Sequence, residues 1–228
     1  MGGGRPGFLD WWLWVTVAVF LALSWVAFLG APDVQGMLVT QRIFYFHFGA
    51  AIAAALSFTV LFVTSIAYLV RRKSRWDVLA AASAEVGVVF TAMVLLTGTV
   101  WAKAQWGAWW TWDPKLTTTL ILWFLGVAYA LLREGVVDQR RRAAYAAVLG
   151  VIIYLDIPII FVASRIWSSI HPIVINNEGF NMSPPILWAT VLGVVANVFW
   201  MVFWVGQRAV QGRMEVEVAE LKERLREG

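Results

Sequence analysis

The chain has 228 residues, of which 61% are hydrophobic and only 14% are charged. A water-soluble domain of this length cannot bury so much apolar surface, so most of the chain must lie in lipid. Because the sequence contains no cysteine, it excludes disulfides, thiolate metal sites and covalent cofactor attachment through a Cys-x-x-Cys-His motif in this chain.

Six apolar runs follow one another along the chain. A membrane-spanning helix needs roughly 20 apolar residues, and five of the runs meet or approach that length. Helices are the default in lipid because they satisfy their backbone hydrogen bonds internally. We therefore expect an all-α membrane protein with six transmembrane helices at about Trp11–Gly30, Phe44–Val70, Val78–Val100, Thr117–Leu132, Ala143–Val162 and Pro185–Gly206. The fourth run is short, and we expect its helix to take its first turn from the tryptophan-rich loop before it.

The positive charges indicate how these helices are oriented. Fourteen of the 18 Lys and Arg residues lie on one side, in the terminal segments and in the loops at 71–77 and 133–142. By the positive-inside rule both termini are cytoplasmic. The net charge of +4 is thus a signal of topology and gives no reason to expect nucleic-acid binding. We divide the chain into a six-helix domain at 1–206 and a cytoplasmic amphipathic tail at 207–228.

The connection between the third and fourth predicted helices is unusually rich in tryptophan. Four of the eight residues at 106–113 are tryptophans, namely Trp106, Trp109, Trp110 and Trp112. Tryptophan prefers the water boundary of a membrane, and the topology above places this loop on the outer side. So many indole rings in one loop form a broad aromatic surface, which suits a large planar cofactor.

Both histidines of the chain fall on the same side as the tryptophan loop. His47 lies near the outer end of the second helix, and His171 lies in the loop between the fifth and sixth. Two imidazoles fill both axial positions of a haem iron. We therefore predict a haem between His47 and His171 with the tryptophans against its ring. The alternative for either histidine is a hydrogen-bonded residue at the membrane boundary.

Haem carries two propionates, which favour cationic partners. Arg42 and Arg165 each precede a histidine by five or six positions on the outer side, and we predict that they contact the propionates. Lys103 and Lys115 are lesser candidates. The alternative is that these cations anchor helix ends among lipid headgroups.

Three acidic residues need an explanation. Asp113 followed by Pro114 is typical of a helix start, because Asp is a strong N-cap and Pro favours the first helical position. Glu85 and Asp156 lie inside apolar runs, where a charge is expensive and suggests a function. Either of these two could instead be protonated or paired with a neighbouring subunit.

The tryptophan loop resembles the signature Trp-Gly-x-x-Trp-x-Trp-Asp of the haem-handling protein superfamily. The match lies at Trp106, Gly107, Trp109, Trp110, Trp112 and Asp113. Larger members continue Trp-Asp-Pro-x-Glu, whereas this chain continues Asp113-Pro114-Lys115-Leu116-Thr117. The chain resembles the small six-helix branch, which is the haem exporter protein C family of cytochrome c maturation. It does so in that continuation, in its length and in the segment Arg42-Ile43-x-Tyr45-x-His47. Ala102 and Ala104 depart from a Gly and a Pro that often precede the signature.

The resemblance implies a haem-delivery subunit that is not itself an enzyme. It implies that haem b is ligated by His47 and His171 at the outer face and is passed to a membrane-anchored haem chaperone for cytochrome c assembly. The implied partners are the ATP-binding and membrane subunits of an ABC transporter and a small single-span subunit. The implied location is the bacterial cytoplasmic (inner) membrane, with the haem site on the periplasmic side.

Other functions remain as alternatives. One is a haem lyase that joins haem to apocytochrome, although the small size and the missing Glu of the signature disfavour it. Another is a b-type electron carrier, which usually needs haem on both sides or at mid-depth. The third is a structural subunit of a transporter whose tryptophans form an aromatic belt. The sequence contains no P-loop motif for ATP hydrolysis.

Overall fold

The computed structural model describes residues 7–34, 36–167, 169–172, 174–176 and 179–227. Helices form nearly all of it, with one antiparallel hairpin of two short strands. In chain order the elements are α1 (Phe8–Trp25), a π-helical turn (Val26–Gly30), a 3₁₀ turn (Leu38–Thr40), α2 (Gln41–Arg71), α3 (Ser74–Trp106), α4 (Pro114–Gly135), α5 (Gln139–Tyr154), α6 (Asp156–Ile166), β1 (Ile175–Asn176), β2 (Gly179–Phe180) and α7 (Pro184–Glu227).

Six helical segments of the described chain are long and apolar enough to cross a membrane. This confirms the predicted number of spans, with α5 and α6 together forming the fifth. The fourth helix begins at Pro114, three residues before the predicted start. Its first turn therefore directly follows the tryptophan-rich segment, which contributes only the N-cap Asp113.

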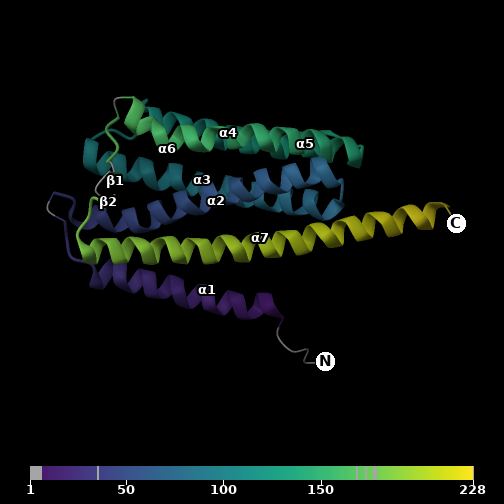
Figure 1. Cartoon of the computed structure of the whole chain (residues 1–228). Coiled ribbons are helices and arrows are strands. Elements are labelled where there is room, and N and C mark those ends of the chain that lie inside the picture. The colour runs from purple at the N-terminus through teal and green to yellow at the C-terminus, as the bar shows by residue number, and fades with distance from the viewer. Residues whose placement is uncertain (1–6, 35, 168, 173, 177–178, 228) are drawn as a thin grey trace.

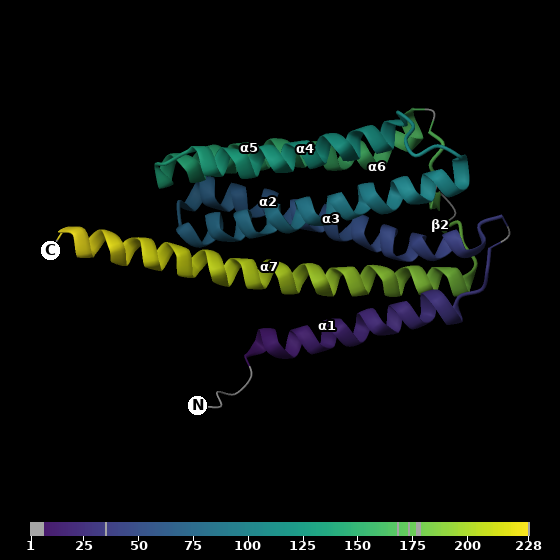
Figure 2. The same cartoon turned by 180° about the vertical axis from the view of Figure 1, so that it is seen from behind.

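The helices lie side by side around the α2–α3 pair. On one side of this pair lies α7, which in turn carries α1, and on the other side lie α4, α5 and α6 (Figures 1 and 2). The start of α1 and the end of α7 lie toward the same end of the bundle, and the β1–β2 hairpin lies at the opposite end (Figure 1). The cytoplasmic placement of the termini stays a prediction.

Glycines allow α2 and α7 to approach closely near the hairpin end. A Cβ on Gly49 of α2 would lie 2.3 Å from the carbonyl oxygen of Gly193 on α7. A Cβ on Gly193 would lie 2.3 Å from the carbonyl oxygen of Tyr45. Small residues at such positions let two backbones touch, which is a common way to pack helices in lipid. This seam between α2 and α7 fixes the part of α2 near the hairpin end, which carries His47.

The fifth span is divided at Leu155, between α5 and α6. Pro158 has no backbone N–H to donate to the carbonyl of Tyr154, and its ring clashes with that carbonyl. The helix is therefore interrupted just before α6. After the break α6 packs against α4, and this places the loop that follows α6 at the hairpin end of the bundle.

Two acidic side chains of α3 form ion pairs within the chain. Asp77 accepts hydrogen bonds of 2.5 and 3.1 Å from Arg133 of α4. Glu85, whose role the sequence left open, accepts one of 3.0 Å from Arg208 of α7. Asp156 is buried, and its Oδ2 has no hydrogen-bond partner within the described part of the chain.

The last helix continues well past the other elements. From Pro184 to Glu227, α7 is a single helix, so the predicted boundary between the six-helix domain and the tail at residue 207 is not a break in secondary structure. Its final turns project beyond the bundle (Figure 1). The cytoplasmic location of this tail stays a prediction.

Candidate functional site

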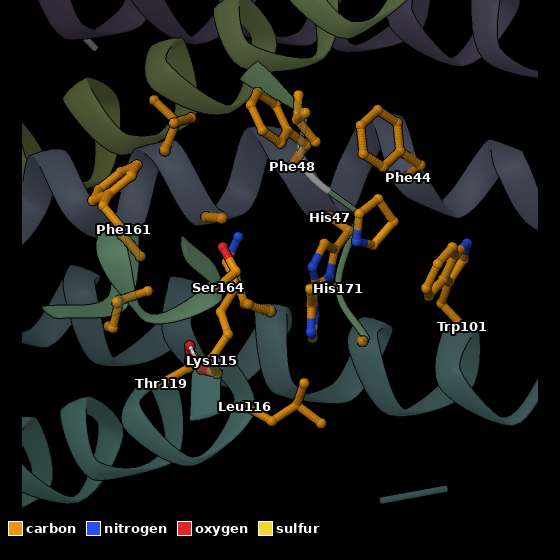
Figure 3. Close-up of a pocket in the computed structure, with 18 of the residues that line it drawn as sticks. Phe44, His47, Phe48, Trp101, Lys115, Leu116, Thr119, Phe161, Ser164 and His171 are labelled. Atoms are coloured by element: carbon orange, nitrogen blue, oxygen red, sulfur yellow. Dashed lines mark hydrogen bonds between the residues drawn. The ribbon is translucent and has the colours of Figure 1, made fainter. Parts of the chain in front are cut away.

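A large cavity lies among α2, α3, α4 and α6 and is bordered by the loops at the hairpin end. Its volume is about 1130 Å³, slightly above the range of about 300–1,000 Å³ that is usual for ligand and cofactor sites. Apolar and aromatic side chains form much of its wall, among them Phe44, Phe48, Trp101, Leu116 and Phe161. Both histidines of the chain project into it from different elements (Figure 3).

His47 enters the cavity from α2. Its Nδ1 lies 2.9 Å from Oγ1 of Thr97 on α3. Thr97 donates its own hydroxyl proton to the carbonyl of Met93 at 2.6 Å, so the imidazole must be the donor in the bond with Thr97. The proton of a neutral His47 is then on Nδ1, and Nε2 carries the free lone pair that a metal ion requires.

His171 enters from the loop that follows α6. Its Nδ1 lies 3.2 Å from Oδ1 of Asp113, and its ring meets the indole of Trp106 edge to face at 5.3 Å. Burial, aided by the positive charge of Lys115, lowers the pKa of His171, and Asp113 offsets only part of this effect. The imidazole is therefore neutral at pH 7. With its proton on Nδ1 toward the carboxylate, its Nε2 is also free for a metal.

Asp113 connects the tryptophan loop to the loop of His171. It caps α4 as predicted, since Oδ1 accepts a hydrogen bond of 2.9 Å from the backbone N–H of Lys115. In addition, Oδ2 accepts one of 2.9 Å from the backbone N–H of Ile170. Burial alone raises the pKa of Asp113, but hydrogen bonds from Ser169, Ile170 and Lys115 outweigh burial and hold the pKa below its usual value. The carboxylate is therefore ionised at neutral pH.

The four signature tryptophans divide into two pairs. Trp106 packs on His171, and Trp110 lines the cavity. Trp109 and Trp112 are 60% and 76% exposed, and they lie outside the cavity wall. Trp112 meets Trp110 edge to face at 5.7 Å, so the exposed ring supports the inner one.

The cations predicted near the propionates lie in different places. Lys115 and Arg165 line the cavity. Arg42 is not part of the described wall, and its guanidinium donates to Asp33 at 2.9 Å. Lys103 donates to the carbonyl of Gly107 at 2.9 Å and lies 6.0 Å from the centre of the Trp109 ring.

Within the described residues, no group of three or more His, Asp or Glu side chains is placed to hold a metal ion alone. A pair of imidazoles in an apolar cavity instead suits a metal whose remaining ligands come from a macrocycle. The residues present are therefore compatible with a haem, and its ligation by His47 and His171 stays a prediction.

Comparison with known proteins places this chain in a family. The model of a protein family described as heme exporter protein C matches residues 6–224. This chain belongs to the heme exporter protein C family. The match includes all six apolar helices, most of the long α7 and both histidines of the cavity.

Curated members of the heme exporter protein C family are similar over most of this chain. The protein of that name from Escherichia coli K12 is 34% identical over 161 residues, which are 70% of this chain and 66% of that protein. The one from Bradyrhizobium diazoefficiens is 33% identical over 160 residues, which are 70% of this chain and 61% of that protein. The one from Paracoccus denitrificans is 37% identical over 118 residues, 52% and 49% of the two chains. The chain thus spans slightly less than two thirds of the first two relatives.

Sequence reasoning missed two side chains at the site of this heme exporter protein C member. Thr97, the partner of His47, and Trp101, which lines the wall, lie on α3 before the signature. They are four residues apart and therefore share one face of the helix. Trp101 lies five residues before Trp106 on the same helix and meets its indole edge to face at 5.1 Å, so its nearness to the signature was the signal that could have found it.

Proposed function

We propose that this protein binds haem b between His47 and His171 and presents it for transfer to a membrane-anchored haem chaperone during cytochrome c assembly. One observation carries the proposal. Two imidazoles from separate elements reach one cavity of about 1130 Å³, and each has its Nδ1 engaged, which leaves both Nε2 atoms available to iron. Membership of the heme exporter protein C family supports haem as the cargo.

The composition of the cavity wall suits the two chemical parts of a haem. Phe44, Phe48 and Phe161 provide apolar contacts for the faces and edges of the porphyrin. Lys115 and Arg165 place positive charge in the same cavity, where the propionates need partners. For Arg42 to make such a contact, its ion pair with Asp33 would have to open.

As a delivery subunit, the protein needs partners on its lipid-facing surface. In the first span and in α4, only 17% of the most apolar 18-residue stretch is buried within the chain. These faces are free to contact lipid or other subunits. We place the protein in a complex with the ATP-binding and membrane subunits of an ABC transporter and a small single-span subunit. The proposed setting is the bacterial cytoplasmic membrane, with the cavity on the periplasmic side.

The proposal assigns delivery of haem to this chain, and not the formation of a covalent bond. A haem lyase that joins haem to apocytochrome must also bind the apocytochrome. Photocrosslinkers at the exposed rings of Trp109 and Trp112 distinguish the two functions. Delivery predicts crosslinks to the haem chaperone, whereas a lyase predicts crosslinks to apocytochrome.

The test is a haem spectrum of the purified protein with each imidazole removed in turn. We expect a Soret band and a low-spin, bis-imidazole spectrum for the wild type. His47→Gly and His171→Gly should each lose haem or become high-spin, and added imidazole should restore the low-spin form by filling the vacated position. Tyr145→Ala, which removes an exposed ring on α5 outside the cavity wall, is the control and should leave the spectrum unchanged.

Two results would count against the proposal. Wild-type spectra in both histidine variants would show that the ligands are wrong. A wild-type protein that binds no haem, alone or with its membrane partners, would show that the function is wrong.

A further inference from the structure

The carboxylate of Asp113 makes more contacts than a helix cap requires. A cap needs a single oxygen, and Ser, Thr or Asn would supply it equally well. In this chain Oδ1 accepts from the backbone of Lys115 and also lies 3.2 Å from Nδ1 of His171. Oδ2 accepts from the backbone of Ile170 at 2.9 Å. Two of these contacts reach a loop 57 and 58 residues further along the chain.

Asp113 is also almost fully enclosed, with 7% of its surface exposed. A buried carboxylate is costly unless hydrogen bonds satisfy it, and here donors from two loops do so. One group therefore fixes the start of α4, the end of the tryptophan signature and the ring of His171 together.

The partners of the two imidazoles differ in charge. His171 donates from Nδ1 to the carboxylate of Asp113, whereas His47 donates to the neutral hydroxyl of Thr97. A carboxylate that accepts the second ring proton of a metal-bound histidine fixes the ring orientation and increases the basicity of the ligating nitrogen. A hydroxyl fixes the orientation with a much smaller electrostatic effect.

We propose that Asp113 is a positioning residue that holds Nε2 of His171 toward the haem iron and makes His171 the stronger electron donor of the two axial ligands. This inference rests on the proposed function. Negative charge beside one ligand stabilises the ferric state, so Asp113 lowers the midpoint potential of the bound haem. The two bonds to iron are then unequal, and the bond to His47 is the weaker one.

Asp113→Asn tests this with little change in shape. Asn is as good an N-cap as Asp, so the start of α4 should be preserved while the negative charge is removed. The matched control is Thr97→Val, which removes the neutral partner of His47 without any change of charge. We expect redox titration of the haem-loaded protein to give a higher midpoint potential for Asp113→Asn than for the wild type, with a smaller shift for Thr97→Val. Haem affinity of Asp113→Asn should fall about tenfold or more, the usual effect of losing such a partner.

A second measurement needs no variant. Because the chain has only two histidines, ¹⁵N-histidine labelling gives the ring spectrum of His47 and His171 alone. We expect both rings of the haem-free wild type to be protonated on Nδ1 at neutral pH. If His171 carries its proton on Nε2, the inference is wrong whether or not Asp113→Asn folds.

The outcomes separate this inference from the proposed function. A wild type with bis-imidazole haem, together with an Asp113→Asn shift no larger than that of Thr97→Val, overturns the role of Asp113 and leaves haem binding intact. A wild type without bis-imidazole haem overturns both.

Discussion

The ring of His47 fits into a space that a single residue on the neighbouring helix provides. A Cβ on Gly98 of α3 would lie 3.1 Å from Cε1 of His47, closer than ordinary van der Waals contact. Gly98 directly follows Thr97, the partner of the same imidazole. One turn of α3 therefore supplies both the hydrogen bond that orients the ring and the room that the ring needs.

Gly98→Ala should displace the imidazole of His47 by a few tenths of an ångström. Overpacking of this kind costs about 1 kcal/mol or more, which corresponds to a roughly fivefold weaker haem affinity. Haem titration of the purified protein measures the loss. Gly135→Ala, where a Cβ meets no atom within 4 Å, is the matched control and should bind haem like the wild type. Equal affinities for both variants would show that the packing around His47 is not tight.

The placement of the basic residues shows why sequence distance is a poor guide to contact. Arg42 precedes His47 by five residues on one helix, and at 3.6 residues per turn this separates the two side chains by roughly 140° around the axis. Arg42 accordingly pairs with Asp33, away from the described wall of the cavity. Lys115 lies 68 positions after His47 yet lines the same cavity, because helix packing brings α4 to that place.

At the level of the elements, the seam between α2 and α7 is the tightest contact near the site. A Cβ on Gly49 would lie 2.3 Å from a backbone oxygen and 2.5 Å from Nδ2 of Asn197. Because backbone atoms cannot rotate away, Gly49→Ala should force the two helices apart. We expect a loss of about 1–3 kcal/mol in the free energy of unfolding, measured in detergent by circular dichroism.

Gly30→Ala is the control for the seam, since a Cβ at that position meets no atom within 4 Å. It should unfold close to the wild type. If Gly49→Ala is as stable as this control, α2 and α7 do not depend on close backbone contact.

The break in the helix before α6 also has a local cause, which is Pro158. Pro158→Ala restores the backbone N–H that can donate to Tyr154, and Ala is about 3 kcal/mol better than Pro inside a helix. We expect α5 and α6 to form a more continuous helix, with thermal stability equal to or above that of the wild type. Haem affinity should fall, because α6 carries Phe161 and Arg165 into the cavity wall.

Thermal unfolding and haem titration of the same Pro158→Ala sample test both parts of this prediction. Undiminished haem affinity would mean that the break does not position the site. The two readouts separate a change in the cavity from a general loss of structure.

The six spans could be predicted from sequence because apolar length is a local property of the chain. The start of α4 could be predicted for the same reason, since Asp113 and Pro114 are adjacent. The second role of Asp113 could not, because it depends on a loop 58 residues away. The interruption at Leu155 needed only Pro158, but the hydropathy of the run gave no sign of it.

For the molecule as a whole, the histidine cavity and the two ion pairs of α3 occupy different parts of the bundle. The cavity is bordered by the hairpin-end loops, whereas Asp77 and Arg133 pair near the start of α3 and the end of α4. Asp77 and Arg133 are largely buried, while Glu85 and Arg208 are 44% and 39% exposed. The two ion pairs have similar geometry but different burial. They therefore allow a direct comparison of how burial changes the cost of losing one charge, at places remote from the imidazoles.

Removing one partner should cost far more at the buried pair. Asp77→Asn leaves Arg133 enclosed without its counter-charge, and breaking such a pair typically costs about 3–5 kcal/mol. Glu85→Gln removes a contact that is only half-buried within the chain. Its partner Arg208 lies just after the sixth apolar run, where headgroups and water screen the charges, so the contact is worth about 0–1 kcal/mol. The double variant Asp77→Leu/Arg133→Met should recover most of the loss, because it removes both charges together. Detergent unfolding curves measure all three, and the folded fraction of each should keep the wild-type haem spectrum. Equal losses for Asp77→Asn and Glu85→Gln would show that burial does not set the cost of breaking these pairs. An altered haem spectrum in either variant would show that the ion pair is not independent of the site.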